Sequence, residues 1–156
     1  MPERPIIREA TPADIKIVLH HRRSMFCDMG YRDEAALAEM VQTSEPFFLR
    51  GLMTGSYRSW LVENTDGRVI AGGGIIISEY HSSPIDTLPK RPIVVNVYTE
   101  PEYRRRGLAR RLMERIIEWC RAEGFGTVLL HASDDGRPLY ESLGFEPTNE
   151  MRLRLK

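Results

Sequence analysis

The chain has 156 residues, of which 42% are hydrophobic and 28% are charged, and we expect residues 1–156 to fold as a single domain. The 22 basic side chains balance the 22 acidic ones, which argues against a uniformly basic surface that binds nucleic acid. The apolar runs are too short to cross a bilayer, and the first ten residues lack the apolar core of a signal peptide. These features predict a cytoplasmic protein without membrane contact.

Cysteine and histidine contribute no recognisable site. The two cysteines lie far apart in the sequence, and the four histidines fall at no metal-ligating spacing, so neither a disulfide framework nor a metal site is expected. Nineteen of the 22 basic residues are arginine, whose planar guanidinium pairs well with phosphate and carboxylate. Clusters of arginine are therefore the first places to look for a binding site.

The first third of the chain predicts one short strand followed by two helices. Residues 6–9 fit a strand, and apolar side chains recur at helical spacing over residues 13–29 after a Thr-Pro helix start. A second helix is expected to begin after Asp33, which can cap it. Pro46 is expected to interrupt that helix, and a further helical turn ends at Gly55.

The rest of the chain predicts five strands and two helices. The Asp66-Gly67 pair is a strong hairpin turn signal. Three consecutive glycines at 72–74 lie inside one strand and predict a bulge or a close backbone approach. The strands are expected at residues 59–63, 69–80, 93–98, 127–131 and 145–155, and the helices at 107–121 and 137–143.

The informative segment joins the strand at 93–98 to the helix that starts at Gly107. Five arginines fall within residues 104–111, and the small residues Gly107 and Ala109 leave the backbone open at the helix start. A helix N-terminus has unpaired N–H groups and a positive dipole end, so it favours an anion. The pattern predicts a pyrophosphate cradle; the alternative is a solvated, charged helix face.

Two other phosphate-binding motifs do not fit. The sequence contains no G-x-x-x-x-G-K-[ST] loop, which excludes a P-loop site. The glycine triplet lies in the middle of a predicted strand and not between a strand and a helix, so it is not a dinucleotide-binding fingerprint.

Two segments of the chain resemble the GCN5-related N-acetyltransferases, the GNAT superfamily. Arg104-x-x-Gly107-x-Ala109 is similar to the family's [Q/R]-x-x-G-x-[G/A] acetyl-CoA motif. The later segment LYESLGFE, residues 139–146, is similar to the family's second signature. The resemblance covers residues 94–146, whereas the first 90 residues match only in the order of their elements.

The resemblance implies an α/β (α+β) fold with a mixed, mostly antiparallel central sheet, splayed fourth and fifth strands, and helices on both faces. Acetyl-CoA would lie as cosubstrate in the wedge between those two strands, without a metal. The backbone of Val97, Tyr98 and Thr99 would pair with the pantetheine amides. Further cofactor contacts are implied for Arg104, Arg105, Arg106, Gly107, Leu108, Ala109 and Arg110 around the pyrophosphate, and for Ser133, where the family often has Asn, and Tyr140.

The implied reaction is direct acetyl transfer to an amine. Tyr140 matches the family's tyrosine that protonates the leaving thiolate, and a phenol with a pKa near 10 is protonated at neutral pH. The alternative role of Tyr140 is packing beside Phe145. The base that takes the amine proton is left open: Glu79 is the first choice, with His81, Glu100 or a water chain as alternatives. A backbone N–H of the splayed strand would bind the developing oxyanion.

The sequence thus predicts an acetyl-CoA-dependent N-acetyltransferase that acts on a primary amine, favouring a small molecule. The alternative is a non-catalytic acyl-CoA-binding sensor or regulatory module. The resemblance also allows a homodimer. One set of apolar side chains in the first two helices and the following strand belongs either to the core or to an acceptor pocket: Met25, Phe26, Met29, Tyr31, Phe47, Phe48, Met53 and Tyr57.

Overall fold

The structure is a computed structural model that describes residues 4–156, so the first three residues of the N-terminal segment considered above lie outside it. Two short 3-10 turns, η1 (Pro12–Asp14) and η2 (Pro101–Tyr103), accompany the main elements. The helices and strands are, in chain order, β1 (Ile6–Glu9), α1 (Ile15–Asp28), α2 (Glu34–Thr54), β2 (Tyr57–Glu63), β3 (Val69–Glu79), β4 (Lys90–Thr99), α3 (Leu108–Ala122), β5 (Leu129–Leu130) and α4 (Arg137–Ser142).

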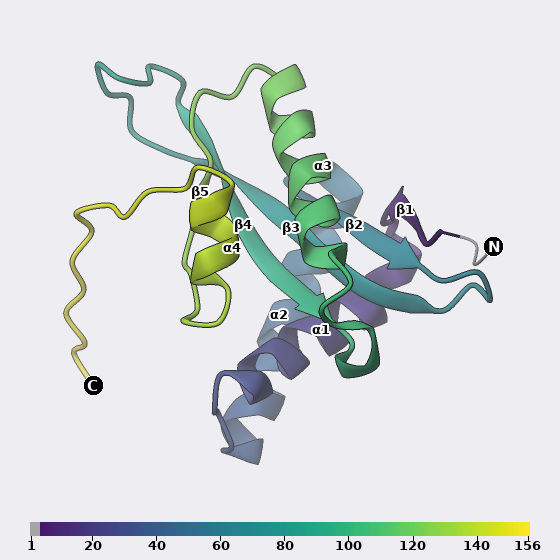
Figure 1. The fold of residues 1–156 in the computed structure, drawn as a ribbon. Helices are drawn as coiled ribbons and strands as arrows, with labels where there is room; N and C mark the ends of the chain where they lie inside the picture. Colours follow the sequence, from purple (N-terminus) through teal and green to yellow (C-terminus); the bar gives the residue numbers. More distant parts are fainter. Residues whose placement is uncertain (1–3) are drawn as a thin grey trace.

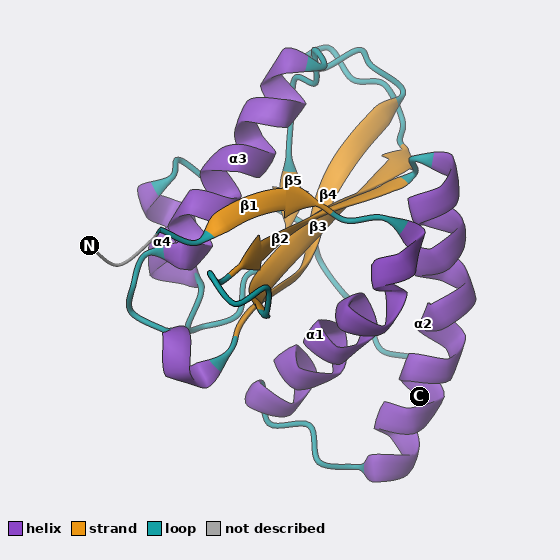
Figure 2. Ribbon diagram, turned by 90° about the vertical axis from the view of Figure 1, so that its right-hand side faces the viewer, coloured by secondary structure: helices purple, strands orange, loops and turns teal. Residues whose placement is uncertain are grey.

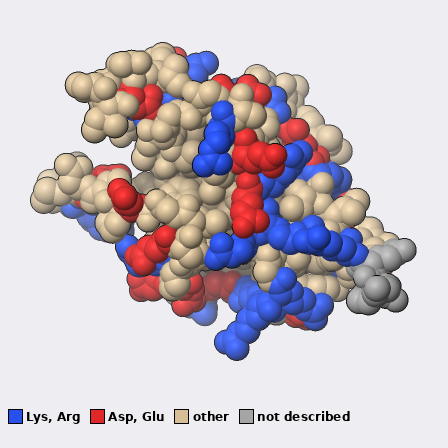
Figure 3. Space-filling view, turned by 45° about the horizontal axis from the view of Figure 1, so that its top comes forward, with Lys and Arg blue, Asp and Glu red and all other residues tan. Residues whose placement is uncertain are grey.

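The five strands form one sheet in the order β1-β2-β3-β4-β5, in which only the β4–β5 pair is parallel. Helices α1 and α2 cover one face of the sheet, and α3 and α4 lie on the other (Figures 1 and 2). This arrangement confirms the predicted mixed, mostly antiparallel sheet with helices on both faces. None of the described helices is long and apolar enough to span a membrane. On the face seen in Figure 3, Lys and Arg are interspersed with Asp and Glu.

The core lies mainly between the sheet and α3. The apolar stripe of α3 buries Leu112, Met113 and Ile116 completely against β2 and β3. Burying such side chains contributes roughly 1.5–3 kcal/mol each, which fixes the position of α3 and of the turn that precedes it.

The glycine triplet of β3 allows helices to approach the sheet closely on both faces. A Cβ at Gly72 would lie 2.7 Å from Nδ1 of His21 on α1, and a Cβ at Gly73 would lie 3.2 Å from the side chain of Leu112 on α3. The predicted close backbone approach is therefore confirmed. The irregular register at Gly72 to Gly74 accompanies an extra residue in the partner strand β4.

The fourth and fifth strands diverge after a very short pairing. β5 contacts β4 only at Ile93 and Val94, whereas β4 continues to Thr99. The edge of β4 that faces β5 is thus left without a strand partner over residues 95–99, which confirms the predicted splay. β5 itself is shorter than the predicted residues 127–131.

Two predicted features of the elements are wrong. Pro46 does not interrupt the second helix, because α2 runs through it and keeps one buried face that includes Leu37, Phe48 and Gly51. Packing of that face outweighs the roughly 3 kcal/mol cost of an internal proline. The predicted strand at 145–155 does not form, because residues 146–156 leave the body of the protein and are exposed.

A buried histidine makes the stability of the fold depend on pH. His21 is 2% exposed, and burial, aided by the neighbouring His20, lowers its pKa to about 4. The unfolded chain, in which His titrates near 6.5, therefore takes up the proton first as the pH falls. The resulting stabilisation is complete above pH 6.5 and declines down to pH 4, by roughly 3 kcal/mol in total.

We expect urea unfolding at a series of pH values to show this decline in the wild type and to lose most of it in His21→Gln. The matched control is His131→Gln, because His131 is exposed and follows directly after the edge strand β5. An equal pH dependence in the wild type and in His21→Gln would contradict this assignment.

Candidate active site

A large cleft opens where β4 and β5 diverge. Its volume is about 1200 Å³, and it is bounded by the C-terminal half of α1, the end of β4, the start of α3 and the β5–α4 loop. Among the predicted cofactor-binding residues, all except Arg106 line it. The lining residues from this prediction are Val97, Tyr98, Thr99, Arg104, Arg105, Gly107, Leu108, Ala109, Arg110, Ser133 and Tyr140.

The N-terminus of α3 presents a row of free backbone donors to the cleft. Arg111 is the first residue of this helix whose N–H finds a carbonyl, that of Gly107 at 3.1 Å. The N–H groups of residues 105–110 have no backbone acceptor among the described residues, and no side chain caps the helix. Gly107 has a φ of 76°, and a Cβ there would meet no atom within 4 Å. The turn is therefore open to an anion.

The arginines of this turn are held in different ways. Arg104 is bound by Asp28 at 2.6 Å and by the carbonyl of Thr99 at 2.9 Å. Arg106 stacks on Tyr103 and does not line the cleft. Arg110 donates to the hydroxyl of Ser142 at 2.6 Å. Arg105 makes no side-chain hydrogen bond within the described residues, although it faces the cleft.

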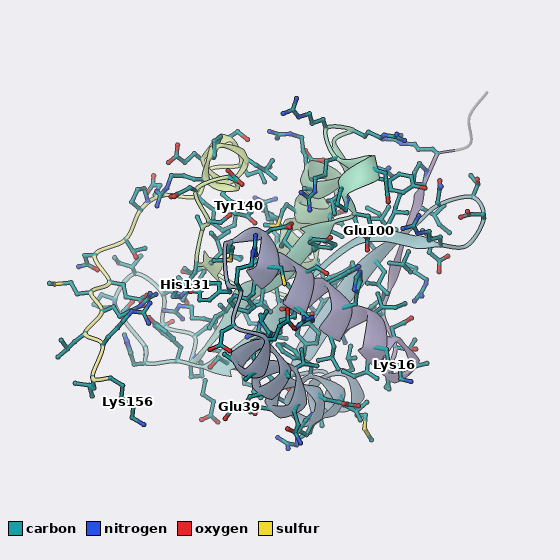
Figure 4. All side chains as sticks on the ribbon, turned by 90° about the horizontal axis from the view of Figure 1, so that it is seen from below. Lys16, Glu39, Glu100, His131, Tyr140 and Lys156 are labelled. Atoms are coloured by element: carbon teal, nitrogen blue, oxygen red, sulfur yellow. The ribbon has the colours of Figure 1, made fainter. Side chains whose placement is uncertain are left out.

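Tyr140 supplies a half-buried phenol to the same cleft. It lies on α4 (Figure 4), its ring packs against Gly136, and it meets the ring of Phe145 edge-on at 6.0 Å between centroids. Burial raises the pKa of the Tyr140 hydroxyl above its ordinary value of 10.0. The hydroxyl therefore carries its proton throughout the neutral range. The contact with Phe145 that the alternative interpretation predicted is present as well.

Asn96 is the residue whose role the sequence did not reveal. It is the extra residue of β4, it adopts a left-handed φ of 62°, and its side chain is 2% exposed. Its amide nitrogen donates to the hydroxyl of Tyr57 at 3.0 Å, and its amide oxygen accepts from Arg22 at 2.9 Å. These bonds hold the bulge at which β4 departs from regular pairing, immediately before the residues that face the cleft.

We expect Asn96→Ala to lower the free energy of unfolding by roughly 3 kcal/mol, because it removes the buried hydrogen bonds to the Tyr57 hydroxyl and to the Arg22 guanidinium. Asn96→Gly is the matched control. It loses the same hydrogen bonds but tolerates the positive φ, so it should be about 1 kcal/mol more stable than the alanine variant. Urea unfolding measures both values. If Asn96→Gly is no more stable than Asn96→Ala, the positive φ at position 96 does not strain the backbone of an alanine there.

The candidate bases are not gathered in the cleft. Glu79 and His81 line a separate hollow of about 470 Å³ at the other end of β4, where Glu79 pairs with Lys90. Glu100 does lie at the cleft end of β4, but its carboxylate contacts Nε2 of His20 at 2.8 Å and does not line the cleft. Glu79 therefore does not line the cleft that Tyr140 lines.

The apolar side chains assigned to the core or to a pocket lie in four different environments. Phe48 and Tyr57 are buried in the core. Met25 and Met29 line the cleft. Phe26 packs under the guanidinium of Arg22. Tyr31, Phe47 and Met53 are exposed, as is Met29 at the cleft.

Comparison with known proteins decides the family. A family model described as the acetyltransferase (GNAT) family matches residues 23–145. The chain belongs to the GNAT family. It is therefore an acetyl-CoA-dependent acyltransferase by family, and its open helix start coincides with the segment that carries the family motif.

Two curated GNAT proteins are similar in sequence. The uncharacterized N-acetyltransferase YjgM of Escherichia coli (strain K12) is 30% identical over 156 residues, covering 93% of this chain and 84% of that protein. The glucosamine 6-phosphate N-acetyltransferase of Trypanosoma brucei brucei is 31% identical over 91 residues. That second match spans 57% of this chain and only 58% of the trypanosomal enzyme.

Solved GNAT structures have the same fold. A GCN5-related N-acetyltransferase from Ralstonia eutropha JMP134 superposes with a TM-score of 0.92 at 33% identity, covering 97% of this chain and 99% of that one. A predicted acetyltransferase from Clostridium acetobutylicum, crystallised with acetyl-CoA, gives a TM-score of 0.88 at 24% identity over 97% of both chains.

Proposed function

We propose that this GNAT protein transfers the acetyl group of acetyl-CoA directly to a primary amine of a small molecule. The observation that carries the proposal is one cleft lined both by the open N-terminus of α3 and by the protonated phenol of Tyr140. At about 1200 Å³ the cleft exceeds the roughly 300–1000 Å³ typical of a site for one drug-sized ligand. It thus has room for the cosubstrate and a small acceptor together.

The residues present fit acetyl-CoA. In this proposal the free N–H groups of residues 105–110 hold the pyrophosphate, with the unengaged guanidinium of Arg105 beside it. The pantetheine amides pair with the unpartnered edge of β4 at Val97, Tyr98 and Thr99. The side chain of Arg106 is held by the ring of Tyr103 and the carbonyl of Glu102, so in this proposal Arg106 contributes only its backbone N–H.

The proposed reaction needs one proton donor from the protein. The amine nitrogen attacks the thioester carbonyl carbon, the carbon–sulfur bond breaks, and the thiolate takes the phenolic proton of Tyr140. The proton that the attacking nitrogen loses then restores the phenol. Tyr140 suits this role because burial raises the pKa of its hydroxyl, which therefore still carries its proton when the thiolate appears.

We do not propose Glu79 or His81 as the base, because both residues line the separate hollow at the other end of β4. The carboxylates that line the cleft are those of Asp28, Asp134 and Asp135. Asp28 is engaged by Arg104, whereas the two aspartates of the β5–α4 loop are exposed. We therefore propose that the proton lost before the attack, when the ammonium form of the acceptor becomes the neutral amine, passes to this loop or to solvent.

A small acceptor is favoured by two observations. Met25 and Met29 of α1 give the cleft a short apolar wall, which suits a compact ligand better than an extended peptide. The trypanosomal relative that matches over 91 residues is named for an amino-sugar phosphate, which is a small molecule.

The test is to incubate the protein with acetyl-CoA and a panel of amino sugars, amino acids and polyamines, and to measure free thiol together with the mass of the acetylated product. We expect at least one amine to raise thiol release above the acceptor-free background. A protein that binds acetyl-CoA in calorimetry, but shows no release with any amine, would instead be the non-catalytic sensor.

A further inference from the structure

Arg22 of α1 carries a positive charge that no carboxylate of the described residues neutralises. Its guanidinium takes part in none of the ion pairs within residues 4–156. Its Nε is buried and has no hydrogen-bond partner among these residues. Burial lowers the pKa of Arg22 below its ordinary value. Charged side chains are rarely buried unless they are paired, so this N–H points to an acceptor from outside the chain.

Arg91 shows how this fold holds an arginine that has a purely structural role. Its side chain is buried, and its Nη1 lies 3.3 Å from the carboxylate of Asp86. It also donates to the carbonyl of Leu88 at 2.8 Å and to the carbonyl of Asp86 at 3.2 Å. Arg22 instead has one neutral acceptor, the amide oxygen of Asn96. The two arginines therefore differ in the feature that a ligand anion would supply.

The free part of the Arg22 guanidinium is the edge that suits an oxyanion. The rings of Phe26 and Phe48 pack against the guanidinium, each with its centroid 5.2 Å from Cζ. Nη1 donates to Asn96, whereas Nε and Nη2 donate to no acceptor in the described residues. Nε and Nη2 point the same way and can bind two oxygens of one carboxylate or phosphate. Nη2, unlike Nε, is not buried, so an anion reaches Nη2 first and meets Nε when the guanidinium turns.

Arg22 belongs to the face of α1 that borders the cleft. Met25 and Met29 follow it by three and seven residues, a spacing that keeps all three on one side of the helix. Both methionines line the cleft. The contact with Asn96 places the guanidinium beside the bulge of β4, directly before Val97, which also lines the cleft. Arg22 thus lies at the inner end of the wall that α1 contributes.

The position proposed for acetyl-CoA brings its thioester to the same end of the cleft. With the pyrophosphate at residues 105–110 and the pantetheine at Thr99 to Val97, the cosubstrate runs back along β4 toward lower residue numbers. Its reactive end therefore comes to the bulge at Asn96, which Arg22 contacts. An amine that attacks the thioester from the α1 side lies beside Arg22.

On the basis of the proposed function, we propose that Arg22 binds an anionic group of the acceptor, so that the substrate is a small amine that also carries a carboxylate or a phosphate. The anion gives the unpaired N–H groups of Arg22 their acceptors and offsets the cost of a charge without a partner. The apolar rings of Phe26 and Phe48 keep water away and strengthen this pairing. Arg22 repels a second cationic group, so polyamines are excluded as substrates.

The test compares pairs of amines that differ in the anionic group, by calorimetry on the full chain in the presence of CoA. Glucosamine 6-phosphate with glucosamine tests a phosphate, and phenylalanine with phenylalaninamide tests a carboxylate. In the wild type we expect the anionic member of at least one pair to bind at least about thirtyfold more tightly than its partner. The pair that shows this preference identifies the anion.

Arg22→Gln should abolish the preference, while its amide N–H can still donate to Asn96. Arg23→Gln is the matched control, because it removes the same charge from α1 but from a side chain that Glu34 already binds at 2.7 Å. The preference should persist in that variant. The wild-type preference is measured without any variant, so a folding defect in Arg22→Gln would not hide it.

The role of Arg22 is overturned if neither anionic amine binds more tightly than its partner in the wild type. It is also overturned if the preference survives in Arg22→Gln or disappears equally in Arg23→Gln. Thiol release with acetyl-CoA separates this inference from the proposed function. Acetylation of amines without regard to their anionic group would overturn the role of Arg22 alone. An Arg22-dependent binding preference without thiol release would overturn acetyl transfer and leave an anionic-amine site.

Discussion

Gly107→Val is expected to raise the dissociation constant for acetyl-CoA at least a hundredfold, equivalent to roughly 3 kcal/mol. The added side chain would project into the open space at the start of α3, where the free N–H groups of residues 105–110 converge on the cleft. A pyrophosphate needs that space to reach the backbone. Calorimetric titration with acetyl-CoA measures the loss.

The left-handed backbone of Gly107 means that a valine there also costs folding energy, about 1–2 kcal/mol. Gly67→Val is the matched control, because Gly67 has a φ of 83°, has equally open surroundings and lies in the β2–β3 turn. Urea unfolding should show similar destabilisation in both variants, whereas only Gly107→Val should lose acetyl-CoA. If Gly107→Val binds acetyl-CoA as tightly as the wild type, or if Gly67→Val loses as much affinity, the start of α3 is not the pyrophosphate site.

The second large effect is expected at Tyr140. Replacing it with phenylalanine should lower kcat about 10²–10³-fold, because the departing thiolate then lacks its proton donor. The affinity for acetyl-CoA should change by no more than about twofold, since the ring and its packing against Phe145 remain. Steady-state rates and calorimetry on the same preparation separate the two quantities.

Tyr103→Phe is the control for this effect. Tyr103 also lines the cleft, but its hydroxyl accepts a hydrogen bond from Asn64 at 3.3 Å and is not proposed to act on sulfur. The pH profile adds an independent readout: because burial raises the pKa of Tyr140 above 10.0, the wild-type rate should fall on the alkaline side only above that pH. An equal loss of kcat in both variants would remove Tyr140 from the chemistry.

Much of the fold was predictable because local signals and packing agree in this chain. The apolar stripe of the helix at 107–121, the hairpin at Asp66-Gly67 and the apolar strand at 93–98 all correspond to observed elements. The family also followed from the two motifs, and the comparisons confirm it. Their residues are local in sequence and need no tertiary information.

The misplaced elements depend on interactions that sequence patterns do not contain. Pro46 is tolerated because residues on both sides of it pack on one continuous face. The predicted last strand is absent because residues 146–156 extend away from the sheet and are exposed, which no local pattern of residues 145–155 indicates. Asn96 stands out in the sequence as the polar residue of the apolar strand at 93–98, but its bulge is fixed by Tyr57 and Arg22, which are remote in sequence.

The distance of Glu79 from the cleft follows from the order and direction of the strands. Two consecutive antiparallel strands bring the end of the first beside the start of the second, so Glu79 lies opposite Lys90. The cleft is at the other end of β4, beside Thr99, which is nine residues or roughly 30 Å further along the strand. The order and direction of the strands are therefore sufficient to predict that Glu79 lies far from the cleft that Tyr140 lines.

A crystal structure of this chain with acetyl-CoA tests the central claim most directly. The account predicts the pyrophosphate within hydrogen-bond distance of backbone nitrogens in residues 105–110, and the thioester sulfur beside the hydroxyl of Tyr140. A cosubstrate bound outside this cleft, or one whose sulfur lies far from Tyr140 and near Glu79, would contradict it.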